Sequence, residues 1–386
     1  MIPRTITEKL ESYLKQFPIV SLTGPRQSGK STLLKTALPD YAYANLEQPD
    51  VLLRAKDDPI GFLENLGSKA IIDEAQRFPD LFSYLQVKSD EINQPGMFVL
   101  SGSQNFLMME HITQSLAGRV GILKLLPLSY RELSSQNHPL STNEWLYQGG
   151  YPRIYDWGVN ATDYYTNYVS TYLERDIRQL INIGDALSFR RFIGICAGRI
   201  GQILNVSDLA DAADISRKTA QTWLSALEAS YLVFFAEPYY RNIGKRLVKS
   251  PKLYFFDTGL ACCVLGIRSK EQLETYYQRG SLFENMVMSE YMKYEYNHGN
   301  NATAYFWRDN HKNEIDLLAE PNLKASAFEI KASATARPNQ FATIDRIASQ
   351  LDIPEDHRFV VYDGAERIES RHGTYLPWSM LYDALA

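Results

Sequence analysis

The sequence predicts an α/β protein in three parts, and three features carry this prediction. First, a glycine-rich loop stands between residues 18–22, which are typical of a buried strand, and residues 32–38, which are typical of a helix. Second, two short helical segments separated by a turn occupy residues 207–230. Third, two strand-like segments with acidic residues follow at 313–318 and 328–331. We therefore expect an α/β domain at residues 1–140, a helical and winged-helix part at 141–256, and a second α/β domain at 257–386.

The composition is that of an ordinary globular protein with more than one core. A chain of 386 residues is too long for a single core, and 45% hydrophobic with 22% charged residues argues against disorder. The formal net charge of −5 excludes a surface that is basic throughout, so contact with a nucleic acid needs a local patch. No apolar run predicts a membrane span or a signal segment, and three cysteines are too few for a disulfide framework. These features predict a cytoplasmic protein without membrane contact.

The loop near the start of the chain fits the phosphate-binding pattern G-x-x-x-x-G-K followed by Ser or Thr. Glycine lets backbone N–H groups approach phosphate oxygens, and the N-terminus of the next helix favours negative charge. We expect Lys30 to reach the β- and γ-phosphates and the Ser31 hydroxyl to ligate Mg²⁺. A chance glycine turn is the alternative, which the flanking strand and helix disfavour. The residues expected to contact the nucleotide are Gly24, Pro25, Arg26, Gln27, Ser28, Gly29, Lys30, Ser31 and Thr32.

An acidic pair after a second apolar strand, residues 70–72, completes the predicted site. Asp73 is expected in the Mg²⁺ shell, and Glu74 is expected to polarise the attacking water. A third strand, residues 97–100, ends in a Ser-Gly-Ser turn. There Ser103 is the first candidate and Ser101 the second for contact with the γ-phosphate or the water. A solvated strand end and a simple turn are the alternatives.

Two arginines are candidates for stabilising transition-state charge. Arg119 follows a glycine turn and precedes the apolar residues 120–126, and it would act on its own nucleotide or on that of a neighbouring subunit. Arg26, inside the loop, is the second candidate. For Arg119, an ordinary surface arginine is an alternative of equal weight.

Together these motifs resemble one family, the bacterial and archaeal AAA-type ATPases that carry a C-terminal domain of unknown function. The resemblance implies an AAA+ core, ATP as the nucleotide, and a ring or dimer as candidate assemblies. It implies no particular biological role. It rests on Pro25-Arg26-Gln27, Asp73-Glu74-Ala75-Gln76, Ser101-Gly102-Ser103, Gly118-Arg119 with Pro127-Leu128-Ser129, Gly149-Gly150-Tyr151-Pro152-Arg153, Lys252-Leu253-Tyr254 with Asp257-Thr258-Gly259-Leu260, and Phe283-Glu284-Asn285.

Residues 207–230 have the pattern of a helix–turn–helix motif. Ser207 or Asp208 is expected to cap the first helix, and Ser216 is expected to cap the second. Apolar residues of the second helix face inward. Its outward side chains are candidate DNA-binding residues, namely Arg217, Lys218 and Gln221.

Strands at residues 233–235 and 254–256 would form the wing of this motif. The segment between them is free of acidic residues from 238 to 252, which predicts a local basic patch. Contact with a protein rather than DNA is an alternative of equal weight. The basic residues of the segment are Arg241, Lys245, Arg246, Lys249 and Lys252, of which Lys245 and Arg246 are the candidates for DNA contact.

The last third of the chain carries acidic and basic residues on two predicted strands. Asp316 lies within the first strand, and Glu329 and Lys331 share one face of the second because strand side chains alternate. If the strands pair, the three side chains meet. Asp316 and Glu329 could then hold Mg²⁺ and activate water against a phosphodiester.

These residues resemble the acid, acid and lysine positions of the PD-(D/E)xK nuclease superfamily. The resemblance adds Glu284, on a helix at residues 282–292, as a further acid and Gln340 as a further polar residue. Ile344 stands where many members have a tyrosine. An inactive fold of this type and a chance Glu–Lys pair are the alternatives.

Three functions remain open from the sequence. The first is an ATP-hydrolysing AAA+ switch that acts on a nucleic-acid or protein partner. The second is an ATP-gated, Mg²⁺-dependent DNA nuclease, and the third is a nucleotide-dependent interaction module with an inactive nuclease fold. ATP and Mg²⁺ are the expected cofactors. DNA, a protein and a second copy of the chain are the candidate partners.

Overall fold

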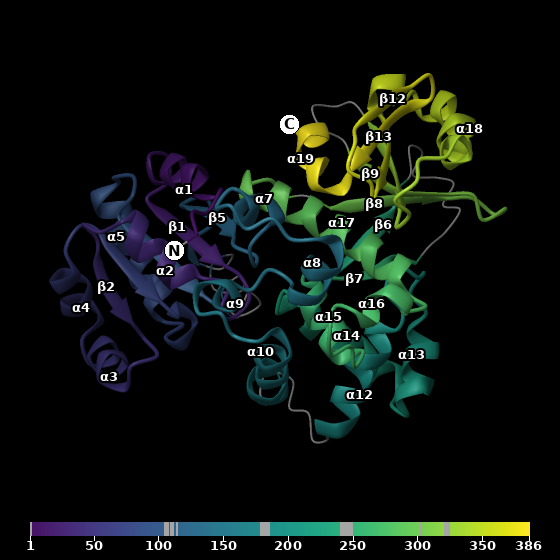
Figure 1. Cartoon of the computed structure of the whole chain (residues 1–386). Coiled ribbons are helices and arrows are strands. Elements are labelled where there is room, and N and C mark those ends of the chain that lie inside the picture. The colour runs from purple at the N-terminus through teal and green to yellow at the C-terminus, as the bar shows by residue number, and fades with distance from the viewer. Residues whose placement is uncertain are drawn as a thin grey trace. The chain divides into compact units, whose positions relative to one another are not determined.

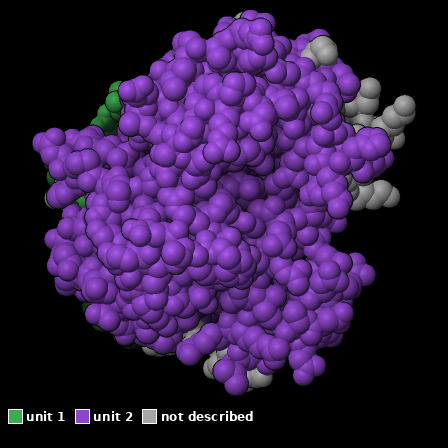
Figure 2. All heavy atoms as spheres, turned by 45° about the vertical axis from the view of Figure 1, so that its right-hand side comes forward, with its two compact units in different colours: residues 1–128, 229–231, 295–301 green, residues 129–228, 232–294, 302–386 purple. Residues whose placement is uncertain are grey.

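The structure is a computed structural model, and it describes residues 2–103, 108, 112, 115–177, 186–239, 250–301, 303–319 and 325–386. The chain forms two compact units, which Figure 2 shows in different colours. Unit 1 comprises residues 1–128, 229–231 and 295–301. Unit 2 comprises residues 129–228, 232–294 and 302–386.

Unit 1 is built on a parallel sheet of five strands in the order β2-β3-β4-β1-β5. Because the strands are parallel, Asp73, Ser101 and Thr23 lie at the same edge of the sheet, where β3, β4 and β1 end. This edge is where the glycine-rich loop follows β1. The strands are β1 (Ile19–Thr23), β2 (Ala42–Asn45), β3 (Ala70–Asp73), β4 (Phe98–Gly102) and β5 (Val120–Lys124).

Helices cover both faces of this sheet (Figure 1), because successive strand residues point to opposite sides. On one face, Val20 and Val99 pack with residues of α1 (Thr7–Leu14) and α2 (Lys30–Ala37). On the other face, Ile19 and Phe98 pack with residues of α3 (Pro49–Asp57), α4 (Pro59–Leu66) and α5 (Leu81–Ile92). The strands are buried on both sides and therefore read as continuous apolar runs.

Unit 2 contains an eight-stranded mixed sheet in the order β12-β13-β11-β10-β9-β8-β6-β7. Strands β9 and β10 pair antiparallel, as the sequence predicts for the two acidic strands. The strands are β6 (Val233–Pro238), β7 (Lys252–Phe255), β8 (Ala304–Arg308), β9 (Glu314–Ala319), β10 (Ser326–Lys331), β11 (Arg358–Tyr362), β12 (Ile368–Ser370) and β13 (Gly373–Pro377).

Helices make up the rest of unit 2, and α17 continues into residues that belong to unit 1. Among the helices in the described ranges, none combines the length and apolar composition that crossing a bilayer requires. The α-helices are α7 (Tyr130–Ser134), α8 (Thr142–Gln148), α9 (Pro152–Asp156), α10 (Ala161–Tyr168), α12 (Ala186–Ala197), α13 (Val206–Ala213), α14 (Arg217–Ala229), α15 (Thr258–Val264), α16 (Gln272–Thr275), α17 (Arg279–Asn297), α18 (Ala342–Leu351) and α19 (Leu381–Leu385).

The predicted helix–turn–helix corresponds to α13 and α14. Ser216 caps α14 by accepting a hydrogen bond from Thr219 N at 3.0 Å, as expected. The cap of α13 is Asn205 instead of Ser207 or Asp208, and its side chain accepts from the backbone N–H groups of both residues. An asparagine one turn earlier satisfies the same orphan N–H groups, so the prediction was wrong only in the residue that supplies the cap.

The predicted wing differs from the structure in its surroundings. Strands β6 and β7 pair antiparallel, as a wing requires, but β6 also pairs in parallel with β8 through Ala236 and Ala304. Both strands therefore belong to the same sheet as β9 and β10, and the boundary expected at residue 256 falls inside one compact unit. The physical reason is that β6 would otherwise present an unpaired edge, which β8 covers.

Candidate nucleotide-binding site

The glycine-rich loop takes a backbone course that few other residues could follow. A Cβ atom on Gly24 would lie 2.1 Å from the carbonyl oxygen of Leu125, so a side chain at this position would clash with backbone. Gly29 precedes α2 with a φ of 96°, in the left-handed region that favours glycine, and Gln27 has a φ of 62°. The Ser28 hydroxyl is buried and has no hydrogen-bond partner among the described residues. The loop is thus a narrow turn with polar groups available to a ligand.

Lys30, the first residue of α2, is buried at the centre of this loop. Its Nζ donates hydrogen bonds to the carbonyl oxygens of Gly24 at 2.9 Å and Pro25 at 2.8 Å. Burial lowers the pKa of Lys30 to about 8, although the carboxylates of Glu74 and Asp73 oppose that shift. At neutral pH the side chain therefore still carries its charge in most molecules, as phosphate binding requires.

Arg4 holds the loop from below, and sequence reasoning missed it. Its guanidinium donates to the carbonyl oxygen of Ser28 at 2.8 Å and to that of Leu126 at 2.7 Å. Arg4 thereby joins the loop to the segment that follows β5. An isolated arginine upstream of the first helix carries no motif, so the sequence contains no signal for this role.

Asp73, at the end of β3, accepts hydrogen bonds from three hydroxyl groups. The donors are Ser31 at 2.6 Å, Tyr43 at 2.5 Å, and Ser101. Burial acts to raise the pKa of Asp73, but these bonds outweigh it and hold the pKa below its usual value. Asp73 is therefore an anion, and it lies beside Ser31 as the predicted magnesium pair requires. Tyr43 was not predicted, because it comes from β2, far away in the sequence.

Glu74 follows Asp73 in the left-handed conformation, with a φ of 55°. One of its carboxylate oxygens accepts from Ser103 Oγ at 3.1 Å and from Gln76 Nε2 at 2.5 Å. The two serines at the end of β4 thus divide between the two acids, since Ser101 binds Asp73 and Ser103 binds Glu74. The structure therefore brings both acids and both candidate serines to the edge of the sheet where the loop lies.

Arg119 does not lie at this edge, so its predicted action on the chain's own nucleotide was wrong. It immediately precedes β5, whose first residue, Val120, is in register with Ile19 at the start of β1. The loop follows the opposite end of β1, and five strand residues span roughly 16 Å. Arg119 instead pairs with Asp90 on α5, at 2.5 and 3.0 Å. The other candidate, Arg26, pairs with Glu47 at 3.2 Å.

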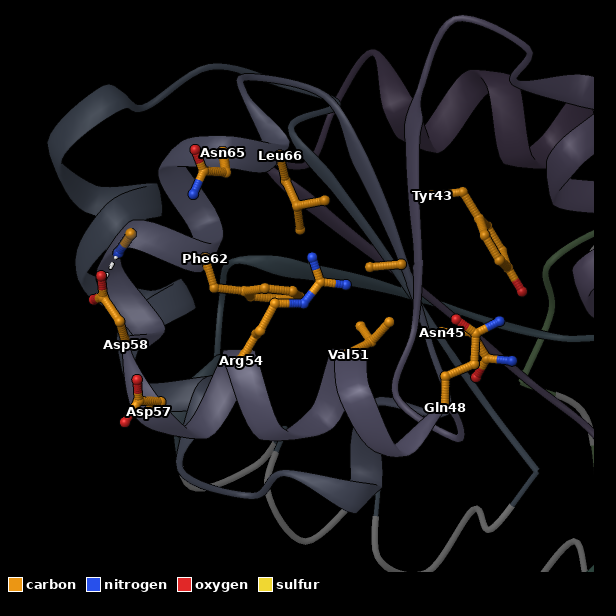
Figure 3. A pocket seen from close by; sticks show the side chains of 12 residues that line it. Tyr43, Asn45, Gln48, Val51, Arg54, Asp57, Asp58, Phe62, Asn65 and Leu66 are labelled. Carbon is orange, nitrogen blue, oxygen red and sulfur yellow. Dashed lines mark hydrogen bonds between the residues drawn. The ribbon is translucent and has the colours of Figure 1, made fainter.

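A separate cavity of about 500 Å³ lies beside the edge strand β2, between α3 and α4 (Figure 3). Its wall combines apolar side chains such as Phe62 with polar ones such as Arg54 and Asn45. None of the loop residues lines it. Tyr43 lines it and also binds Asp73, so the cavity borders the nucleotide site without being part of it.

The candidate DNA-binding residues on α14 are exposed. Arg217, Lys218 and Gln221 lie on the solvent side, whereas Trp223 and Leu227 are buried. Lys245 and Arg246 lie outside the described residues. Lys252, expected in the same basic patch, is buried instead, with a side chain only 1% exposed.

The four candidate nuclease residues do come together in unit 2. Lys331 Nζ lies 2.5 Å from Glu329 Oε1, and Ile330 N donates to Asp316 Oδ2 at 2.8 Å. Glu284, on α17, is linked to Asp316 through Lys252, which lies 3.1 Å from Glu284 Oε1 and 4.0 Å from Asp316 Oδ1. Gln340 lies apart and bonds Ser333 and the backbone N–H of Arg337.

These residues do not fit the predicted metal ion. Among the described residues, no group of three or more His, Cys, Asp or Glu side chains could hold a metal. The ammonium group of Lys252 contacts the carboxylates of Glu284 and Glu314, and Asp316 is its third anionic neighbour. The prediction of Asp316 and Glu329 as metal ligands is therefore not supported, because the sequence gave no sign that a lysine from β7 would enter the cluster.

Glu329 predicts a pH-dependent stability. Burial, aided by the nearby Asp316 carboxylate, raises its pKa to about 8, although Lys331 opposes that shift and Glu314 adds a smaller effect in the same direction as Asp316. With an ordinary pKa of 4.5 in the unfolded chain, the folded protein holds one more proton between about pH 4.5 and pH 8. The contribution of this group to folding is complete below that window and is lost as the pH rises through it. The loss is on the order of a few kcal/mol.

The variant Glu329→Gln should lack this dependence, since its side chain stays neutral. We expect its melting temperature to exceed that of the wild type increasingly as the pH rises from about 5 to about 8. The exposed Glu366→Gln serves as the control in the same unit. Parallel melting profiles of wild type and Glu329→Gln over this range would contradict the prediction.

Comparison with known proteins finds matches along the whole chain. Family models match as an AAA domain at residues 16–134, a domain of unknown function (DUF8612) at 140–271 and a domain of unknown function (DUF4143) at 279–381. Two uncharacterized proteins, Rv2008c of Mycobacterium tuberculosis and Mb2031c of Mycobacterium bovis, are each 33% identical over 370 residues, 93% of this chain and 82% of theirs. A solved structure, the Walker-type ATPase PABY2304 of Pyrococcus abyssi, aligns with a TM-score of 0.48 and 16% identity, covering 68% of this chain and 96% of that one. That structural similarity is too low to carry an argument.

The fold and site of unit 1 define a P-loop protein with an AAA domain. The chain belongs to the family of the two mycobacterial proteins. The predicted resemblance to AAA-type P-loop ATPases is confirmed in this form. The two models beyond residue 134 describe domains of unknown function, so the winged-helix and nuclease assignments stay predictions.

Proposed function

We propose that this protein is an ATP-hydrolysing molecular switch. The observation that carries the proposal is the bond between Ser31 and Asp73, 2.6 Å long, directly beside the glycine-rich loop. A hydroxyl after the loop lysine and a carboxylate at a strand end are the protein groups that hold Mg²⁺ in P-loop NTPases. The residues present therefore fit a magnesium nucleotide.

Each polar group of the site has a task in this proposal. Backbone N–H groups of the loop and Lys30 would bind the phosphates. Ser31 and Asp73 would hold Mg²⁺, which when bound neutralises charge on the phosphate oxygens. Glu74 would orient and polarise the attacking water, and Ser103 would keep its carboxylate in place through their 3.1 Å hydrogen bond.

A hydrogen bond at the base of the loop supports a switch. The hydroxyl of Thr23, the last residue of β1, lies 2.7 Å from that of Tyr231. Tyr231 is buried, has a φ of 56°, and lies in the turn between α14 and β6. A movement of the loop on release of the γ-phosphate would therefore reach the two elements that this turn joins.

Calorimetry of the full chain with ATP or GTP, in the presence and absence of Mg²⁺, tests the proposal together with an assay of phosphate release. We expect saturable binding of the ATP complex and steady hydrolysis. Well-folded protein that gives no binding heat with either triphosphate would exclude the proposal. Binding without phosphate release would reduce the function to that of a nucleotide-binding module.

The proposed partner site is the exposed side of α14. If the partner is DNA, the double variant Arg217→Glu/Lys218→Glu should weaken binding and reduce the slope of log K against log salt by about two charges. Filter binding at several salt concentrations measures both quantities, and the exposed variant Arg54→Glu in unit 1 serves as the control. Protein that binds no DNA at low salt would exclude this partner and favour a protein.

A further inference from the structure

We propose that Lys252 is the resident cation of the acidic cluster in unit 2, so that this cluster is a closed structural element and not a metal-dependent nuclease centre. The cluster consists of the carboxylates of Glu284, Glu314, Asp316 and Glu329 and the cationic groups of Lys252, Arg308 and Lys331.

The position of Lys252 carries the proposal. Its Nζ lies 3.1 Å from Glu284 Oε1, contacts Glu314 Oε1, and lies 4.0 Å from Asp316 Oδ1. These carboxylates come from α17 and from two positions on β9, so they converge from different sides on one ammonium group. Mg²⁺ would have to bind such oxygens at 2.0–2.1 Å. It cannot do so while an ammonium group occupies the point on which they converge.

Further contacts keep Lys252 in place. Its side chain is only 1% exposed, and its ammonium lies 5.4 Å from the centre of the Phe306 ring, a distance at which the ring stabilises a cation. Its backbone is paired with Ala236 of β6 and bridged to Ile203. Lys252 therefore cannot withdraw without opening the end of β7.

The remaining charges are also paired inside the cluster. Arg308 lies 3.0 Å from Glu314, and Lys331 lies 2.5 Å from Glu329. Tyr254 OH donates to Glu284 at 2.6 Å. A buried carboxylate needs a cation or a hydrogen-bond donor, and here the chain itself supplies both. A divalent ion would have to displace these groups and overcome repulsion from Lys252.

Titration of Mn²⁺ into the full-length Asp73→Ala protein, which lacks the predicted metal ligand of unit 1, tests the proposal. Electron paramagnetic resonance reports the free Mn²⁺. We expect the same free Mn²⁺ in Asp73→Ala and in Asp73→Ala/Asp316→Asn. Saturable Mn²⁺ binding that the Asp316→Asn change abolishes would overturn the proposal.

Removing the lysine tests the same idea in the opposite direction. In the Asp73→Ala background, Lys252→Ala should bind Mn²⁺ and its melting temperature should rise by about 3 °C or more on addition of the ion. Lys331→Ala, which leaves Lys252 in place, should show no such rise. Folded Lys252→Ala protein that does not respond to Mn²⁺ would also count against the proposal. If Lys252→Ala fails to fold with or without Mn²⁺, the titration of the Asp73→Ala protein decides.

Discussion

The variant Glu74→Gln should bind ATP and fail to hydrolyse it. Glutamine has the size of glutamate and can still accept a hydrogen bond from Ser103, but it cannot polarise a water molecule as a carboxylate does. We expect the rate of phosphate release to fall by about 10²- to 10⁴-fold, the usual contribution of a general base. The affinity for ATP should stay near that of the wild type, because Glu74 does not belong to the loop that binds the phosphates.

Phosphate release and calorimetric affinity, measured on the same preparation, separate these two effects. The exposed Glu64→Gln on α4 is a matched control that removes a carboxylate from the same unit. It should behave as the wild type. Turnover of Glu74→Gln within about threefold of the wild-type rate would remove Glu74 from the mechanism, since removing a general base costs far more than that.

The second large effect is expected for Lys30→Ala, which should lose affinity for ATP. Lys30 is the buried cation nearest to the loop carbonyls of Gly24 and Pro25, and a charge-assisted hydrogen bond to phosphate contributes about 1.5–3 kcal/mol. Affinity should therefore fall about 10- to 100-fold. Hydrolysis at a fixed, low ATP concentration should fall with it.

The control for Lys30→Ala is Lys56→Ala, an exposed lysine on α3 in the same unit. Melting curves establish that both variants are folded, because loss of Lys30 also leaves two loop carbonyls without a donor. A folded Lys30→Ala protein with wild-type ATP affinity would contradict the placement of the phosphates at this loop.

The sequence predicted the nucleotide site well because its main parts are local. A phosphate loop needs contiguous residues between a strand and a helix, and the acidic pair follows an apolar strand directly. The structure places Ser31 and Ser101 on Asp73, and Ser103 on Glu74, as parallel strand ends require. Tyr43 and Arg4 could not be predicted, since neither belongs to a motif and both reach the site through long-range packing.

The prediction for unit 2 was accurate for its strands and wrong about the chemistry of its charges. Alternation placed Glu329 and Lys331 on one face, and the pairing of β9 with β10 brought Asp316 to them. Lys252 lay in a basic stretch and was expected at the surface. The pairing of β6 with both β7 and β8 is what carries it into the acidic cluster.

The sequence by itself determined the α/β class of the first unit, its phosphate loop and its two acids, because these depend on short-range spacing and on strand burial. Only the tertiary structure decided that Arg119 lies at the far end of its strand and that a lysine fills the acidic cluster. The physical reason is that sheet order and register are settled by contacts between segments far apart in the chain. A one-dimensional pattern shows which residues a strand contains, and the neighbouring strands determine which charges they meet.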